Sequence, residues 1–213
     1  LTGDVLFSRA LEALGRLDDP RPLKILSHAC RLICEGELLQ IDGRYNTDLE
    51  EDAYLEIIEK KTAVLFGAAA ELGAMLAGAT EDESRRLYAY GRRIGLAFQI
   101  VDDCLDLTGV EAAAGKSLGS DLRNGEYTLP VLHMLANTAG AARQQALALL
   151  RTQPGPSREE VLPYVERTGS VEYAMRAARA EIRRARDEVA FLPPSAARRA
   201  LVDVPEYILG RVS

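Results

Sequence analysis

The chain has 213 residues, of which 47% are hydrophobic and 6% aromatic, and it contains no tryptophan. This length suffices for the core of one domain, and the composition suits helices that pack through alanine and leucine. The net charge of −6 and the pI of about 5.1 argue against a nucleic-acid-binding surface. We expect neither a secretory signal nor a transmembrane segment, and a cytoplasmic location, because no apolar run is long enough to span a bilayer.

Helices account for nearly all of the predicted structure, because no segment alternates apolar and polar residues over a useful length. We therefore predict an all-α fold with a single domain over residues 1–213. The predicted helices cover residues 4–17, 23–44, 47–76, 80–107, 129–137, 141–151, 157 onward, 169–191 and 193 onward. Asp18-Asp19-Pro20 ends the first of them, since proline cannot continue a helix.

Three of the predicted helix starts carry the pattern of a capping box, in which Ser or Thr is followed three residues later by Glu. The pairs are Thr47 with Glu50, Thr80 with Glu83, and Ser157 with Glu160. In a capping box the hydroxyl and the carboxylate each accept a hydrogen bond from the other residue's backbone N–H. Each pair therefore predicts a helix that begins directly after its first residue.

The three cysteines, an odd number, do not suggest a disulfide framework. We expect Cys30, Cys34 and Cys104 to be reduced thiols, as in cytosolic proteins. Cys30 and Cys34 share a helical face near His28, but the spacing of a four-ligand zinc site is missing, so core packing is the preferred interpretation. His28 and His133 lack the Ser, Asp or Cys partners that nucleophilic catalysis requires, and we expect both to be structural.

Three carboxylates lie at the end of the helix predicted to begin near Thr80. Asp102, Asp103 and Asp106 occur there among apolar residues, where uncompensated negative charge is costly to bury. Asp102 and Asp106 are four residues apart and share a helical face, which Asp103 flanks. Gln99 lies one turn earlier. Such oxygen ligands suit a hard divalent cation that binds phosphates, and the alternative is that the acids simply face solvent.

The segment from Thr108 to Leu129 lacks the helical pattern and is punctuated by glycines. A loop of this length inside a compact domain is usually functional. Gly115 would let backbone amides approach an anion, and Lys116 would add a positive charge. Directly after the acids, this segment predicts a mobile lid over a metal–phosphate cluster. The alternative is a flexible surface connection with an incidental lysine.

Short motifs along the chain form one ordered set. They are Glu35-Gly36-Glu37-Leu38-Leu39-Gln40, the segment from Tyr54 to Ala63, Phe98-Gln99, Asp102-Asp103-x-x-Asp106, Gly115-Lys116, Gly119-x-Asp121-Leu122, Thr128-Leu129-Pro130, Leu192-Pro193-Pro194-Ser195 and Tyr207-Ile208-Leu209-Gly210-Arg211. In this order they closely resemble motifs of the trans-isoprenyl diphosphate synthases, also called polyprenyl synthetases. The resemblance covers essentially the whole chain. It implies an isoprenoid synthase-type helical bundle around a central cavity.

The resemblance also implies an activity, a cofactor and an assembly. The activity is the head-to-tail 1′-4 condensation of an allylic diphosphate with isopentenyl diphosphate, which makes a longer polyprenyl diphosphate. The cofactor is Mg²⁺, and the assembly is a homodimer. The implied metal-binding residues are Asp102, Asp103, Asp106 and, through metal-bound water, Asp121.

The same resemblance implies substrate-binding residues. Lys61 and Lys116 would neutralise diphosphate oxygens, while Thr62 would lie beside the allylic diphosphate. Gln99 would line the pocket near the allylic end. Two further residues, Glu37 and Gln40, lie three apart on one helical face and would line the cavity; a structural hydrogen bond is the alternative for both.

The chain departs from the family pattern in two ways. The family has an earlier Asp-Asp-x-x-Asp motif, which this sequence lacks, and the chain begins at Leu1. We therefore expect these residues to be the C-terminal portion of a longer enzyme and to be very weakly active alone. The family also often has Lys where this chain has Glu126, just before Thr128. An anion there should weaken diphosphate binding unless Glu126 turns outward.

Other functions stay open at this level. One is a non-catalytic subunit of a heteromeric prenyl synthase, although retention of the second acidic motif argues against it. Another is a terpene cyclase on the same scaffold, although Gly115-Lys116 and Thr128-Leu129-Pro130 favour chain elongation. A purely structural helical bundle is the remaining alternative.

Overall fold

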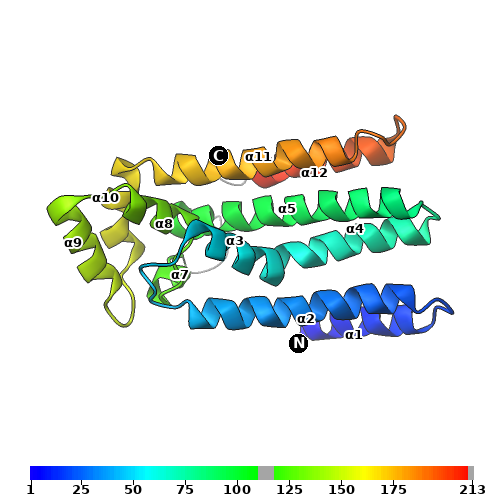
Figure 1. Ribbon diagram of the computed structural model, residues 1–213, viewed down its shortest axis with the longest axis horizontal. Coiled ribbons are helices and arrows are strands. Elements are labelled where there is room, and N and C mark those ends of the chain that lie inside the picture. The colour runs from blue at the N-terminus through cyan, green and yellow to red at the C-terminus, as the bar shows by residue number, and fades with distance from the viewer. Residues whose placement is uncertain (110–117, 211–213) are drawn as a thin grey trace.

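The computed structural model describes residues 1–109 and 118–210, and within these ranges it contains helices and no strand (Figure 1). In chain order the helices are α1 (Thr2–Gly15), α2 (Arg21–Asp42), α3 (Glu51–Ile58), the π-helical turn η1 (Glu59–Ala63), α4 (Val64–Leu76), α5 (Glu81–Thr108), α7 (Ser120–Arg123), α8 (Leu129–Ala136), α9 (Gly140–Leu150), α10 (Arg158–Arg167), α11 (Ser170–Glu188) and α12 (Ala196–Leu209). The predicted all-α fold is confirmed. Among the described residues, no helix has the length and apolar character needed to cross a membrane.

The long helix α5 lies at the centre of the molecule, with its most extensive contacts to α4 on one side and α11 on the other (Figure 1). Ile100, Val101 and Cys104 of α5 are each at most 1% exposed. Gly95 allows α5 to approach η1 closely, because a Cβ at this position would lie 2.5 Å from Cα of Ala63. Packing on both sides therefore fixes the helix that carries the three acids.

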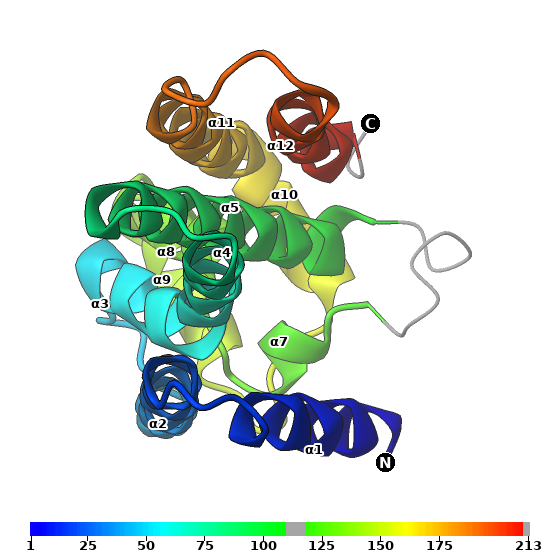
Figure 2. The same cartoon turned by 90° about the vertical axis from the view of Figure 1, so that its right-hand side faces the viewer.

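The remaining helices form two outer layers and one end of the bundle. Figure 2 shows α2 and α1 on the side of α4, and α11 with α12 on the opposite side of α5. None of the residues of α1 is buried. Helices α8, α9 and α10 gather at one end of the molecule, next to the end of α5 that carries the acids (Figure 1).

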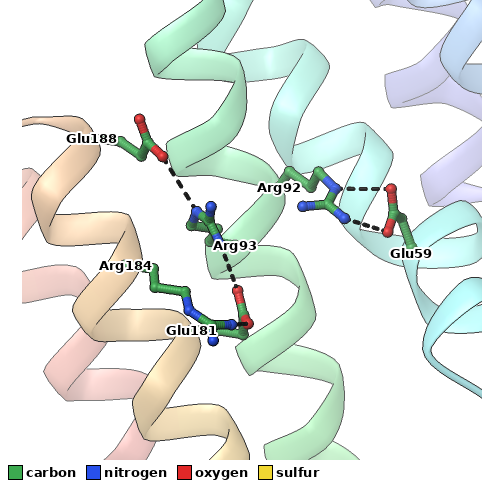
Figure 3. Close-up of polar contacts among 6 residues, drawn as sticks. All are labelled: Glu59, Arg92, Arg93, Glu181, Arg184 and Glu188. Atoms are coloured by element: carbon green, nitrogen blue, oxygen red, sulfur yellow. Dashed lines mark hydrogen bonds and ion pairs between the residues drawn. The ribbon is translucent and has the colours of Figure 1, made fainter. Parts of the chain in front are cut away.

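Two neighbouring arginines of α5 tie it to the helices on either side (Figure 3). Arg92 donates from Nε to Oε1 of Glu59 in η1 at 2.8 Å, and its Nη2 donates to the other carboxylate oxygen. Arg93 points to α11, where Nη1 lies 3.1 Å from Glu181 and Nε lies 3.4 Å from Glu188. These partly buried ion pairs reinforce the same packing, because they are less screened than pairs on the open surface.

The capping predictions are confirmed at two helix starts and wrong at the third. Thr80 and Ser157 form capping boxes at the starts of α5 and α10. Thr47 does not cap a helix, because α3 begins at Glu51, after an extended residue 50. The physical reason is tertiary: the backbone N–H of Tyr45 donates to the carbonyl of Gly125 at 2.7 Å, which holds this connection against another part of the chain.

Two further differences concern the interior of predicted segments. The helix predicted for residues 47–76 is interrupted by η1, which contains Lys61 and Thr62. The segment predicted as a loop between Thr108 and Leu129 contains the short helix α7. Gly119, with a left-handed φ of 73°, precedes that helix, a backbone conformation that favours glycine.

Candidate functional site

A cavity of about 280 Å³ lies among the C-terminal part of α5, the end of α2, the segment from α3 into η1, and the segment from α7 to α8. Its charged and amide-bearing lining residues are Gln40, Lys61, Gln99, Asp102, Asp103, Asp121 and Glu126. Apolar side chains, among them Leu49, Ile57 and Ile58, complete the lining. The cavity thus combines a concentration of carboxylates with a lysine and an apolar surface, as small-molecule sites often do.

Most of the predicted site residues meet at this cavity. Gln40, Lys61, Gln99, Asp102, Asp103 and Asp121 line it directly. Thr62 and Glu37 are outside the lining but contact it, because Thr62 donates to Gln99 at 2.8 Å and Glu37 pairs with Lys61 at 3.1 Å. The prediction for Lys116, together with Gly115, lies outside the described residues.

The acid wall of the cavity consists of Asp102 and Asp103 of α5 and Asp121 of α7. Asp103 is 5% exposed; its Oδ2 accepts from the hydroxyl of Tyr54 at 2.6 Å and its Oδ1 accepts from Nε2 of Gln99 at 2.7 Å. Burial raises the pKa of Asp103 to about 7; the charges of Asp121 and Asp102 also raise it, while the bonds from Tyr54 and Gln99 lower it. Asp103 is therefore a buried acid whose two oxygens are both held by hydrogen bonds, close to two further carboxylates.

Asp106, the third acid of the motif, is turned to a different partner. It is 3% exposed, and its carboxylate accepts from Oγ of Ser120 at 3.1 Å and from the backbone N–H of Asp121 at 3.2 Å. These donors belong to the first turn of α7, where unpaired backbone N–H groups favour an acceptor. The structure therefore does not bring Asp106 to the cavity. It places this residue behind Asp121, as the anchor of α7.

A second part of the cavity, called the lysine wall, is lined by Gln40 of α2, Lys61 of η1 and Glu126, and Glu37 of α2 contacts Lys61. Nζ of Lys61 lies 2.6 Å from Oε1 of Gln40 and 3.1 Å from Oε2 of Glu37. This approach of α2 to η1 requires Gly36, because a Cβ there would lie 2.5 Å from the backbone N of Lys61. The π-helical turn and the glycine together set where the ammonium lies.

Glu126 does not turn outward, so the structure does not provide the orientation in which this anion would leave diphosphate binding unaffected. Its side chain is only 11% exposed and lines the cavity. Oε1 accepts from Nε of Arg44 at 2.9 Å and from Nη2 of the same arginine at 2.5 Å, while Oε2 accepts from Gln40. The carboxylate is thus paired inside the site.

Sequence reasoning missed two residues that contact charged groups of this site, Arg44 beside Glu126 and Tyr54 beside Asp103. For Tyr54 a signal existed, because residues 54, 57, 58 and 61 follow the spacing of one helical face and all four line the cavity. For Arg44 we find no such signal, because its partner Glu126 lies 82 residues later in the chain.

The donor chemistry of the acid wall fits a hard divalent cation. Asp102, Asp103 and Asp121 offer only oxygen ligands, and a cation beside them would offset the burial and the carboxylate repulsion that raise the pKa of Asp103. Over residues 1–109 and 118–210, no three acidic, histidine or cysteine side chains are arranged as a ready metal cage.

Comparison with known proteins adds an independent finding. The family model described as "Polyprenyl synthetase" matches residues 1–166. The chain is 38% identical to a short chain isoprenyl diphosphate synthase of Methanothermobacter thermautotrophicus, over 99% of the chain and 66% of the relative. It is 34% identical to heptaprenyl diphosphate synthase component 2 of Bacillus subtilis, over 97% of the chain and 59% of the relative.

Solved structures agree in fold. A polyprenyl synthase from Caulobacter crescentus, crystallised with calcium and isoprenyl diphosphate, superimposes with a TM-score of 0.90 at 34% identity. The match covers 99% of this chain and 65% of that one. The chain thus spans 59 to 66% of the length of the relatives named here.

Proposed function

Because the chain belongs to the polyprenyl synthetase family, we propose that it serves in head-to-tail prenyl transfer, the condensation of an allylic diphosphate with isopentenyl diphosphate. The observation that supports this proposal most strongly is one cavity lined by Asp102, Asp103 and Asp121, by Lys61 and by apolar side chains. In this reaction the allylic C–O bond breaks, the diphosphate leaves with the electron pair, the double bond of isopentenyl diphosphate attacks, and a proton is lost. The site must therefore stabilise negative charge and exclude water.

The acid wall would hold Mg²⁺ through Asp102, Asp103 and Asp121. When bound, the ion supplies positive charge to the oxygens of the leaving diphosphate. Tyr54 and Gln99 orient the two oxygens of Asp103, as outer partners of a metal ligand do. A calcium ion accompanies isoprenyl diphosphate in the solved structure of the relative from Caulobacter crescentus, which supports a divalent metal in this role.

The lysine wall would bind the diphosphate directly. Lys61 supplies an ammonium at the cavity surface, and Thr62 fixes Gln99 near the proposed allylic end. Lys116 is proposed as a second cation on the strength of the family motif. Ile57 and Ile58, beside Lys61 in the lining, keep water from the reacting carbon.

The proposal extends to assembly and location. We propose a homodimer in the cytoplasm, with small-molecule diphosphates rather than nucleic acid as ligands. A heteromer is a second candidate, favoured by the similarity to heptaprenyl diphosphate synthase component 2, whose name indicates a multi-component enzyme. In that case the chain would be the component that carries the acid wall.

Prenyl transfer is tested by incubating the purified native polypeptide that carries these residues with Mg²⁺, an allylic diphosphate and isopentenyl diphosphate. Mass spectrometry should show products that grow by whole isoprene units and disappear when EDTA is added. Cyclic hydrocarbons instead of diphosphates would contradict chain elongation. The 213-residue polypeptide assayed by itself should turn over very weakly, because it carries one Asp-Asp-x-x-Asp motif where the family has two.

A further inference from the structure

A continuous line of polar contacts crosses the lysine wall. Arg44 donates to Glu126, Gln40 donates from Nε2 to the other oxygen of Glu126, and Lys61 donates to Oε1 of Gln40 at 2.6 Å. Glu37 closes the line with an ion pair to Lys61 at 3.1 Å. The line joins α2, η1 and the segment after α7, which are far apart in the sequence.

The side-chain amide of Gln40 can make both of its hydrogen bonds in this line, to Lys61 and to Glu126, in only one orientation. A primary amide has one accepting oxygen and one donating nitrogen, an ammonium only donates, and a carboxylate only accepts. The oxygen of Gln40 must therefore face Lys61, and its nitrogen must face Glu126, as the structure shows. A lysine at position 126 would present donors to both ends of Gln40 and remove this preference.

The burial of Glu126 needs a counter-charge, and Arg44 provides it. Glu126 lines a cavity that also contains Asp102, Asp103 and Asp121, so burying its carboxylate there without a counter-charge would be strongly disfavoured. Arg44 donates two hydrogen bonds to a single oxygen of Glu126, and its own side chain is 39% exposed. The second oxygen is thereby left for Gln40.

The backbone holds the two ends of this line together. The N–H of Tyr45 donates to the carbonyl of Gly125 at 2.7 Å, and these residues directly adjoin Arg44 and Glu126. Tyr45 has a left-handed φ of 59°, which is unusual for a residue with a side chain. A strained residue at this contact indicates that the docking of the two segments is maintained by the surrounding structure.

We propose that Glu126 is a positioning residue for Lys61: its carboxylate orients the Gln40 amide, which holds the Lys61 ammonium at the cavity surface. The inference rests on the proposed function, because it takes Lys61 to be a diphosphate-binding residue. It reverses the expectation from charge alone, by which an anion at position 126 only weakens diphosphate binding. In this chain the carboxylate of Glu126 helps to position the ammonium of Lys61, which binds the diphosphate.

The test compares two variants that remove the same charge. Glu126→Gln keeps an oxygen that accepts from Gln40, whereas Glu126→Ala removes the acceptor. With inorganic pyrophosphate and Mg²⁺ in a titration calorimeter, Glu126→Gln should bind about tenfold more tightly than Glu126→Ala, the equivalent of one hydrogen bond between neutral groups. Charge alone predicts equal affinities for the two, and equal affinities would overturn the proposal.

A second measurement shows whether the effect passes through Gln40. In a Gln40→Met background, which has neither amide group, the difference between Glu126→Gln and Glu126→Ala should vanish. A difference that persists there would mean that Glu126 acts by another route, and the proposal would be wrong. Thermal unfolding of each variant identifies any that fail to fold, and the comparison is then made with Glu126→Met, which is also neutral and lacks an oxygen acceptor, in place of Glu126→Ala.

Lys61→Met separates this inference from the proposed function. If Lys61→Met weakens pyrophosphate binding while the two Glu126 variants bind equally, only the positioning role fails. If Lys61→Met binds pyrophosphate as the unmodified chain does, the proposed role of Lys61 fails, and the positioning role fails with it.

Discussion

The two walls of the cavity are built in different ways. The acid wall lies mostly on α5, where Ile100, Val101 and Cys104 are at most 1% exposed, so core packing fixes the helix that carries Asp102 and Asp103. In the lysine wall, the side chain of Lys61 is 35% exposed, and polar contacts between distant segments hold its ammonium. The acid wall therefore depends mainly on core packing, whereas the lysine wall depends more on polar contacts between segments that are distant in the sequence. Substitutions should therefore act differently on the two.

The largest effect is expected from Asp102→Ala in the acid wall. Loss of a proposed metal ligand should lower turnover of the intact enzyme by about 100-fold or more. Because the core behind the wall is unchanged, the free energy of unfolding should move by no more than about 0.5 kcal/mol. Kinetics and denaturant unfolding measure the two quantities. Asp203→Ala, at an exposed position of α12, is the control. Unchanged kinetics in Asp102→Ala would count against the metal role.

Tyr54→Phe should have the next largest effect, because it removes the hydroxyl that holds Oδ2 of Asp103. Without this donor the carboxylate loses its orientation, and its pKa rises further, since that hydrogen bond lowers it. Mg²⁺-dependent pyrophosphate binding should weaken by about tenfold, as for other outer partners of metal ligands. Tyr207→Phe is the matched control, because Tyr207 is 80% exposed. Equal affinities in the two variants would show that Tyr54 does not support the acid wall.

Gly36→Ala tests the lysine wall through its backbone. The added methyl group would meet the backbone of Lys61 and should cost about 1–3 kcal/mol in unfolding free energy, together with a loss of pyrophosphate affinity. Gly73→Ala on α4 is the control: nothing lies within 4 Å of its Cβ, and it should stabilise the helix by up to about 1 kcal/mol. Chemical denaturation measures both. A neutral Gly36→Ala would mean that α2 and η1 need not approach this closely.

The smallest effect concerns His133, which belongs to neither wall. Its Nδ1 lies 2.8 Å from Oγ of Ser170, and burial lowers its pKa, with a further lowering by Arg176 opposed by Glu51. A histidine with a folded-state pKa below its unfolded value of about 6.5 binds a proton less readily when folded. The free energy of unfolding should therefore fall as the pH drops below 6.5.

In the variant His133→Gln, the part of the decrease in unfolding free energy at low pH that is due to His133 should be absent. The measurement is the denaturant midpoint of both proteins between pH 7.5 and 5.0. Parallel midpoints over the whole range would contradict the assignment to His133.

Much of the fold could be predicted because local signals and tertiary packing agree. Thr80 and Ser157 begin helices where the capping pattern places them, and Ser195 caps α12 through its bond from the N–H of Arg198. Thr47 fails because the docking of Tyr45 against Gly125 delays the helix to Glu51. That contact joins residues 80 positions apart, and local pattern carries no information about it.

The same distinction applies to the site. Asp102 and Asp103 could be placed at a cavity because helical spacing among apolar residues fixes their direction. Spacing also placed Asp106 with them, but the first turn of α7 offers it better donors. The pairing of Glu126 with Arg44 could not be predicted, because it depends on the path of the chain between them.

The most direct test of the central claim, that this cavity binds a diphosphate through a divalent metal, is a crystal structure obtained with Mg²⁺ and pyrophosphate. The account predicts the ion against Asp102 and Asp103, and the pyrophosphate between that ion and the Nζ of Lys61. A structure in which pyrophosphate lies elsewhere, with both carboxylates free of metal, would contradict it.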